Sequence, residues 1–144
     1  MSTEENKAIV RGYFEQVQQA NWDDLKKFVA LDLINHESKA TQLGLETHKS
    51  ALRSIRGTFP DQQVVIDDMI AEGDKVVVRT RLCGTHQGSA LPTFRGIRPE
   101  GRPVEWKFIH IFRLRDGKIV EHWAEHDGLA VRQQLSGAER ALRA

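Results

Sequence analysis

Aromatic rings, an imidazole and carboxylates alternate along two strand-like stretches near the C-terminus, and together these groups can perform acid–base chemistry. The stretches flank Asp116-Gly117, a dipeptide typical of a two-residue β-hairpin turn. Counting outward from this turn pairs His110 with Trp123, and directly opposed residues share a face of the sheet. The face of His110 is then expected to carry Trp106, Phe108, Phe112, Glu121, Trp123 and Asp127.

A carboxylate held against tryptophan rings is poorly solvated, so its proton affinity should rise toward working pH. Such a group can act as a general base on a carbon next to a carbonyl. We expect Asp127 to be this base and Glu121 to be a second catalytic carboxylate. His110 would bind the developing enolate oxygen or orient the acid. This chemistry needs neither metal nor cofactor, and we expect none. The alternative is a core face with its acids at the solvent-exposed rim and His110 as a structural histidine.

The opposite face of the same hairpin is mostly aliphatic. It is expected to carry Ile109, Ile111, Val120 and Ala124, flanked by Arg113 and His122. Monomers rarely expose such a continuous apolar patch, and a two-fold axis needs a self-complementary one. We therefore expect a homodimer through this face. A one-residue bulge in the hairpin would exchange the partners beyond it.

The string His122-Trp123-Ala124-Glu125-His126 matches a zinc-peptidase motif, H-x-x-E-H. That motif requires a helix, which brings both histidines to one face. Here the string follows a hairpin turn and alternates like a strand, in which residues four apart are separated by about 13 Å. We expect no metal site.

Composition restricts the classes of partner. The chain has 144 residues, the size of one domain, and a formal net charge of +1. It therefore has no basic field that would attract nucleic acid or a membrane surface. Its longest apolar run, residues 28–31, is too short to cross a bilayer. Cys83 is the only cysteine, which favours a cytoplasmic location.

The elements that position these residues change from helical to strand periodicity along the chain. Ser2 to Glu5 forms a capping box that starts a helix over 3–20. Asn21 and Thr47 can cap two further helices, the second ending at Pro60. Strands are expected over 63–71, 75–83, 104–114 and 118–125, with a loop over 84–103 and a short helix over 129–135. Helices placed before strands indicate an α+β fold with a largely antiparallel sheet.

Several of these segments resemble the SnoaL-like polyketide cyclases of the nuclear-transport-factor-2-like superfamily. The similarity covers about residues 5–136 of a single domain over 1–144. The matching segments are Tyr13-Phe14, Asn35-His36, Phe59-Pro60-Asp61, residues 73–77 and 84–88, the run 116–123, Asp127 and residues 133–136. The resemblance implies a cone-shaped α+β barrel, with N-terminal helices closing a pocket on a curved sheet. It also implies an intramolecular aldol closure of a polyketide ester, performed without cofactor by an aspartate and a histidine.

The resemblance places His110 on the strand of the catalytic histidine. The resemblance also implies an acid directly after the tryptophan, where this chain has Ala124, so Asp127, Glu121 or Glu125 would have to replace it. A small hydrophobic substrate is expected to contact Trp106, Phe108, Trp123, Phe14 and His36. Two function classes follow: a cofactor-free cyclase or isomerase, and a non-catalytic protein that binds a small ligand on the same fold.

Overall fold

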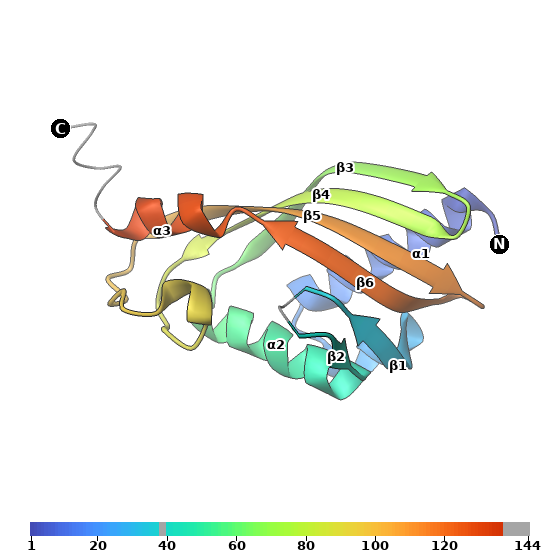
Figure 1. The fold of residues 1–144 in the computed structure, drawn as a ribbon, viewed down its shortest axis with the longest axis horizontal. Coiled ribbons are helices and arrows are strands. Elements are labelled where there is room, and N and C mark those ends of the chain that lie inside the picture. Colours follow the sequence, from blue (N-terminus) through green and yellow to red (C-terminus); the bar gives the residue numbers. More distant parts are fainter. Residues whose placement is uncertain (38–39, 137–144) are drawn as a thin grey trace.

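The fold is built on one six-stranded sheet with two long helices against one of its faces (Figure 1). The computed structural model describes residues 1–37 and 40–136. In chain order, the elements are α1 (Thr3–Gln18), the 3-10 helix η1 (Trp22–Lys27), β1 (Val29–Asn35), β2 (Gln42–Leu43), α2 (Leu45–Thr58), β3 (Gln63–Glu72), β4 (Lys75–Thr85), the 3-10 helix η2 (Pro92–Phe94), β5 (Pro103–Arg115), β6 (Lys118–His126) and α3 (Gly128–Ser136).

The sheet is mixed and open, with strand order β2-β1-β6-β5-β4-β3. Every neighbouring pair is antiparallel except β1 and β6, which run parallel. Helices α1 and α2 cover what we call the inner face, and the opposite side is the outer face (Figure 1). The predicted α+β class is confirmed. None of the described helices is long and apolar enough to cross a membrane.

The helix cap and the hairpin turns lie at the positions that the sequence predicted. The Ser2 hydroxyl accepts the Glu5 amide at 3.1 Å and closes the start of α1. The β5–β6 turn holds Asp116 and Gly117 at positive φ, 51° and 78°, as a mirror-image hairpin turn requires. The β3–β4 turn falls at Gly73 and Asp74, between the strands expected over 63–71 and 75–83.

The segment between the first two long helices differs from the prediction. A 3-10 helix follows Asn21, and the chain then enters β1, where Val29, Leu33 and Asn35 are buried and Leu31 is exposed. The strand is stabilised by pairing with distant β6, which local periodicity does not reveal. Helix α2 also begins earlier than Thr47, because Gly44 turns the backbone at a φ of 94°.

A β-bulge at Val120 changes the register of the C-terminal hairpin. Leu114 pairs with Ile119, but the next residue, Arg113, pairs with Glu121 instead of Val120. Beyond this point His110 is opposite Ala124, not Trp123. The predicted shared face of His110 with Glu121, Trp123 and Asp127 is therefore wrong, and so is the outward placement of His122 and Ala124.

The bulge has a clear energetic reason. It places the Glu121 carboxylate on the outer face, where it accepts a hydrogen bond from Arg113 Nε at 2.9 Å. Without the bulge, this carboxylate would point to the inner face without that partner, at a cost of about 3–5 kcal/mol. Small Ala124 and neutral His122 occupy the inner face instead.

Candidate functional site

A narrow cavity of about 50 Å³ lies between the inner face of the sheet and helices α1 and α2. Its walls are aromatic and aliphatic, with a set of polar groups among them. The residues that line it are Tyr13, Phe14, Val17, Glu37, His48, Leu52, Ile55, Gln62, Val64, Thr80, Leu82, Phe108, His110 and His122.

A hydrogen-bonded chain fixes the direction of one donor. Asn35 Oδ1 accepts the Glu37 backbone N–H at 3.1 Å, so the other amide atom, Nδ2, donates to His48 Nδ1 at 3.2 Å. Burial lowers the pKa of His48 to about 4, so the ring is neutral at pH 7 and carries its proton on Nε2. Nε2 then donates to Tyr13 Oη at 2.7 Å. The phenolic proton of Tyr13 is left to donate elsewhere in the cavity.

Two further histidines form a buried pair beside this chain. His110 Nδ1 and His122 Nε2 are joined by one hydrogen bond of 2.9 Å, while His110 Nε2 lies 3.3 Å from the Thr80 hydroxyl. Burial lowers the pKa of His110 to about 3, and burial together with the neighbouring His110 lowers the pKa of His122 well below its usual range. Both rings are neutral at pH 7, so they act through hydrogen bonds rather than charge.

Two buried polar atoms of cavity-lining residues have no hydrogen-bond partner. They are Gln62 Oε1 and His122 Nδ1, and each residue is only 2% exposed. Buried polar atoms are nearly always paired, so unpaired ones in a cavity wall are suited to a polar ligand. Neither residue was singled out as a ligand contact from the sequence, because Gln62 stands in the turn before a strand and His122 was placed on the wrong face.

Glu37 is the carboxylate of this cavity, and the sequence analysis missed it. It lies two residues after the end of β1, and Asn35 hydrogen-bonds its side chain. Burial raises the pKa of Glu37, and the Asn35 bond offsets this in part. The nearby Glu37 charge, in addition to burial, raises the pKa of Tyr13. Only the Asn35-His36 segment, noted for its family resemblance, pointed to this part of the chain.

The structure separates the predicted site residues into three places. Phe14, Phe108 and His110 line the inner cavity. Trp106 also faces inward, but packs in a second buried cluster with Phe59 and Phe94.

The remaining predicted residues lie on the outer face. His36 stacks on Trp123 at a ring distance of 5.2 Å and bonds Glu121 Oε2 at 2.7 Å. His36 and Arg113 lower the pKa of Glu121. Asp127 Oδ1 accepts the Ala130 amide at 3.1 Å and so caps the start of α3.

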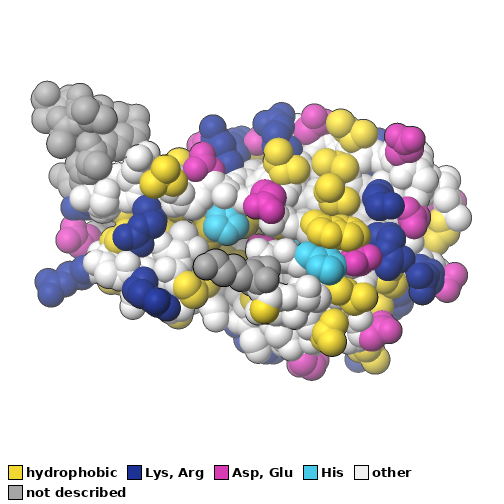
Figure 2. Space-filling view, viewed as in Figure 1, with side chains coloured by type: hydrophobic (Ala, Val, Ile, Leu, Met, Phe, Trp, Pro, Cys, Tyr) yellow, Lys and Arg dark blue, Asp and Glu magenta, His cyan; other side chains and the backbone are white. Residues whose placement is uncertain are grey.

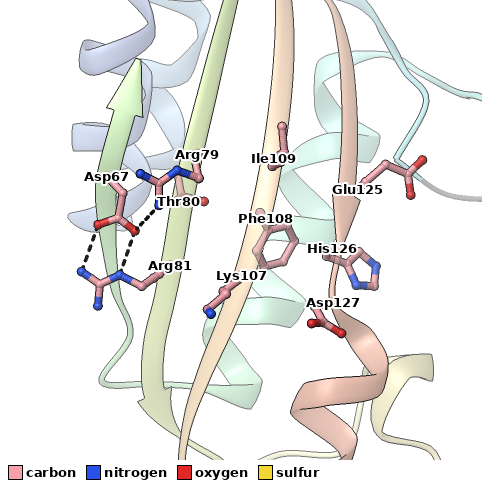
Figure 3. A pocket seen from close by; sticks show the side chains of 10 residues that line it. All are labelled: Asp67, Arg79, Thr80, Arg81, Lys107, Phe108, Ile109, Glu125, His126 and Asp127. Atoms are coloured by element: carbon pink, nitrogen blue, oxygen red, sulfur yellow. Dashed lines mark hydrogen bonds and ion pairs between the residues drawn. The ribbon is translucent and has the colours of Figure 1, made fainter. Parts of the chain in front are cut away.

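The outer face carries a wide, open groove of about 580 Å³ (Figure 3). Asp67 accepts two hydrogen bonds from Arg81, at 2.8 and 3.0 Å, and lies 3.7 Å from Arg79. The Arg81 hydrogen bonds lower the pKa of Asp67. Asp127 lies across the groove from this cluster (Figure 3). The face in Figure 2 mixes hydrophobic and charged side chains, with histidine among them.

Within residues 1–37 and 40–136, no three histidine, cysteine or acidic side chains are placed to hold a metal ion together. The H-x-x-E-H string lies on strand β6, as its alternation predicted.

Comparison with known proteins assigns the fold and a family model. The model described as SnoaL-like polyketide cyclase matches residues 7–135. A search of curated proteins found no match. IdmH from Streptomyces antibioticus, a proposed polyketide cyclase, is 27% identical with a TM-score of 0.80 over 91% of this chain and 98% of its own. A proposed SnoaL-like cyclase from Jannaschia sp. CCS1 is 27% identical with a TM-score of 0.81 over 93% of each chain.

A proposed hydroxylase shares the same fold. AclR from Streptomyces galilaeus is 25% identical with a TM-score of 0.81, over 94% of this chain and 83% of its own. The curved, open sheet with helices on its inner face is thus an α+β cone fold that relatives use for different proposed activities.

Proposed function

This chain belongs to the SnoaL-like polyketide cyclase family, and from that premise we propose that it performs cofactor-free acid–base catalysis in the inner cavity. The reaction is an intramolecular aldol closure of the polyketide-cyclase type, or a related isomerisation, on a small hydrophobic carbonyl compound. The observation that carries this proposal is the Tyr13–His48–Asn35 chain, because it leaves the phenolic proton of Tyr13 free to bind a carbonyl oxygen.

The chemistry follows from what a neutral donor does in an apolar cavity. Removing a proton beside a carbonyl places negative charge on its oxygen, and a fixed donor in a poorly solvated site stabilises that charge. Tyr13 supplies the donor, and the neutral ring of His48 holds it in place. His110 and His122 place further hydrogen-bonding nitrogens in the same cavity, next to His48. The catalytic roles predicted for Asp127 and Glu121 stay predictions, and the geometry favours His110 among the three.

The size of the cavity limits the substrate. Pockets that enclose a drug-sized ligand have volumes of about 300–1,000 Å³. A cavity of about 50 Å³ holds only a small reacting end, so the rest of a larger substrate would extend from the opening. A compact carbonyl group flanked by alkyl chain fits walls made of Phe14, Leu52 and Phe108.

A linear methyl diketone with three methylene groups between its carbonyls tests the proposal. Its aldol closure gives a six-membered hydroxyketone of the same mass, which proton NMR distinguishes from the diketone. We expect the protein to accelerate closure. Tyr13→Phe should lower the rate by about 10²–10³-fold, the usual effect of removing one oxyanion donor. Closure no faster than in buffer would reject the proposal.

The second candidate function is non-catalytic binding of a small ligand. It is favoured by Ala124, which leaves the position opposite His110 without an acid. Mass spectrometry of the purified protein would then find a bound hydrophobic compound, and that binding would be unchanged when the carboxylates are neutralised.

We also propose that the outer face forms a homodimer interface, in a cytoplasmic protein. One apolar row crosses four strands, because Ile70 is opposite Val77, Val77 opposite Ile111, and Ile111 opposite Trp123. Ile70 is 59% exposed, and Ile109, two residues before Ile111 on the same face of β5, is 52% exposed. This row replaces the predicted one, since Ala124 faces inward.

The oligomeric state tests the proposed dimer. Light scattering should give twice the chain mass, and Ile111→Glu should give monomers. A monomeric wild type would reject the dimer, and a dimeric Ile111→Glu variant would place the interface elsewhere.

A further inference from the structure

Strand β6 does not supply an acid to the inner cavity. Ala124 stands opposite His110, at the position where the family resemblance leads one to expect a carboxylate. Glu121 is held on the outer face by His36 and Arg113, and Asp127 caps α3. Among the described residues that line the cavity, Glu37 is the one carboxylate.

Asn35 fixes the place of Glu37. Its backbone is paired in register with His122 of β6, and its side chain is buried between His48 and Glu37. Through Oδ1 it holds the Glu37 backbone N–H, and it also hydrogen-bonds the carboxylate. The carboxylate is therefore anchored to the sheet that carries the two buried histidines.

The surroundings of Glu37 favour a proton acceptor over an ion pair. The titratable groups lining the same cavity are Tyr13, His48, His110 and His122, and no lysine or arginine is among the described lining residues. Burial raises the pKa of the Glu37 carboxylate, and none of the described residues that line the cavity is a cation that would lower it. A raised carboxylate pKa brings a general base closer to working pH.

We propose that the Glu37 carboxylate is the catalytic base of this cavity and takes the role of the acid that position 124 lacks. This inference rests on the proposed function. A Glu37 oxygen takes the proton from the carbon next to a substrate carbonyl. The C–H electron pair forms the enolate, and Tyr13 donates a hydrogen bond to its oxygen.

The cycle then closes within one substrate molecule. The enolate carbon attacks the second carbonyl carbon, a C–C bond forms, and the C=O electron pair moves to oxygen. The protonated Glu37 returns its proton to that alkoxide, which restores the carboxylate. No atom enters or leaves, so product and substrate have the same mass.

The diketone closure assay tests this role through four single variants and one double variant. Glu37→Gln keeps the shape and should lower the rate by about 10²–10⁴-fold, the usual contribution of a general base. Glu37→Asp keeps the negative charge, but its shorter side chain holds the carboxylate farther from the substrate. The factor by which kcat falls should therefore exceed the factor by which KM rises.

The matched control, Glu105→Gln, neutralises an outer-face carboxylate and should keep wild-type turnover. Ala124→Asp in the Glu37→Gln background should restore part of the rate, because it returns a carboxylate beside His110. Asp127→Asn tests the base predicted from the sequence.

A carbon NMR titration of the glutamate side chains gives a readout that does not depend on turnover. One resonance, absent from Glu37→Gln, should titrate above the ordinary value of 4.5. An ordinary pKa for that resonance would overturn the proposal.

The outcomes separate the two claims. Full turnover by Glu37→Gln together with loss in Asp127→Asn would overturn the role of Glu37 and leave the proposed function in place. No acceleration by the wild type would overturn both. Loss in Glu37→Gln, partial recovery with Ala124→Asp and a raised pKa together support the proposal.

Discussion

The inner and outer faces of the C-terminal hairpin use similar residues in opposite ways. On the inner face, His110 and His122 are buried, neutral and bonded to each other. On the outer face, Glu121 lies between His36 and Arg113, and Asp67 between two arginines. His122 is the chain neighbour of both Glu121 and Trp123, so one bulge decides which side chains face the cavity. The titratable side chains of the two faces differ in charge state because of their surroundings and not because of their residue type.

The largest expected difference between the faces is in packing. Phe112 is 1% exposed and contacts the rings of Tyr13, Phe14 and His122. Phe112→Ala should lower the free energy of unfolding by about 3–5 kcal/mol, because it leaves a cavity in the core. Ile109→Ala, on the outer face of the same strand, should cost under about 1 kcal/mol at a protein concentration at which the chain is monomeric. Urea unfolding of both variants checks this, and equal losses would contradict the assignment of faces.

Acid should destabilise the inner face first. Because burial lowers the pKa of His48 and His110 to about 4 and about 3, the unfolded chain binds their protons at a higher pH than the folded chain. Their contribution to stability is complete above the unfolded pKa of 6.5. It is lost as pH falls from there toward the folded values, by about 1.4 kcal/mol per pH unit for each histidine.

Unfolding free energies between about pH 7 and about pH 5 measure this loss. His122→Gln removes one buried histidine and should reduce the slope. His36→Gln removes an outer-face histidine and should leave the slope of unfolding free energy against pH unchanged, because His48, His110 and His122 remain. An unchanged slope in His122→Gln would show that this ring is not buried in its neutral form. The carboxylates with lowered pKa, such as Asp67 and Glu121, lose their contribution at lower pH.

The smallest effect is expected in the groove of Figure 3. Asp67→Asn removes the anion between Arg79 and Arg81, both of which reach solvent. Exposed pairs contribute about 0–1 kcal/mol and are screened by salt. The unfolding free energy should change by less than this, and the difference from wild type should shrink in high salt. A loss comparable to that of Phe112→Ala would mean that this face is covered by another surface.

Local signals in the sequence were enough for most of the fold. The Ser2 cap, the Gly73-Asp74 and Asp116-Gly117 turns and the long strands depend on neighbouring residues, and they are where the patterns indicated. His110 was also correctly placed on a face with Phe108 and Phe112.

The rest depends on partners that local patterns do not show. Strand β1 is defined by β6, far along the chain, and Phe28 and Val29 alone suit a helix equally well. The bulge at Val120 adds one residue to the strand, and whether it stabilises the fold depends on which side chains it buries against distant elements. Glu37 lies just outside the matching Asn35-His36 segment, and only the packing of Asn35 against His48 places it in the cavity.

The parallel pairing of β1 with β6 also affects the order of assembly. A ribosome releases β1 and Glu37 early and β6 late, and contacts between distant segments form slowly because a long loop must close first. The antiparallel β3–β4 and β5–β6 hairpins can form from adjacent segments, whereas β1 must wait for the end of the chain. Asn35 and Glu37 are therefore expected to reach their places only in the last step of folding. Loss of β6 from a truncated chain would leave β1 paired only with the two-residue strand β2 and detached from the rest of the sheet.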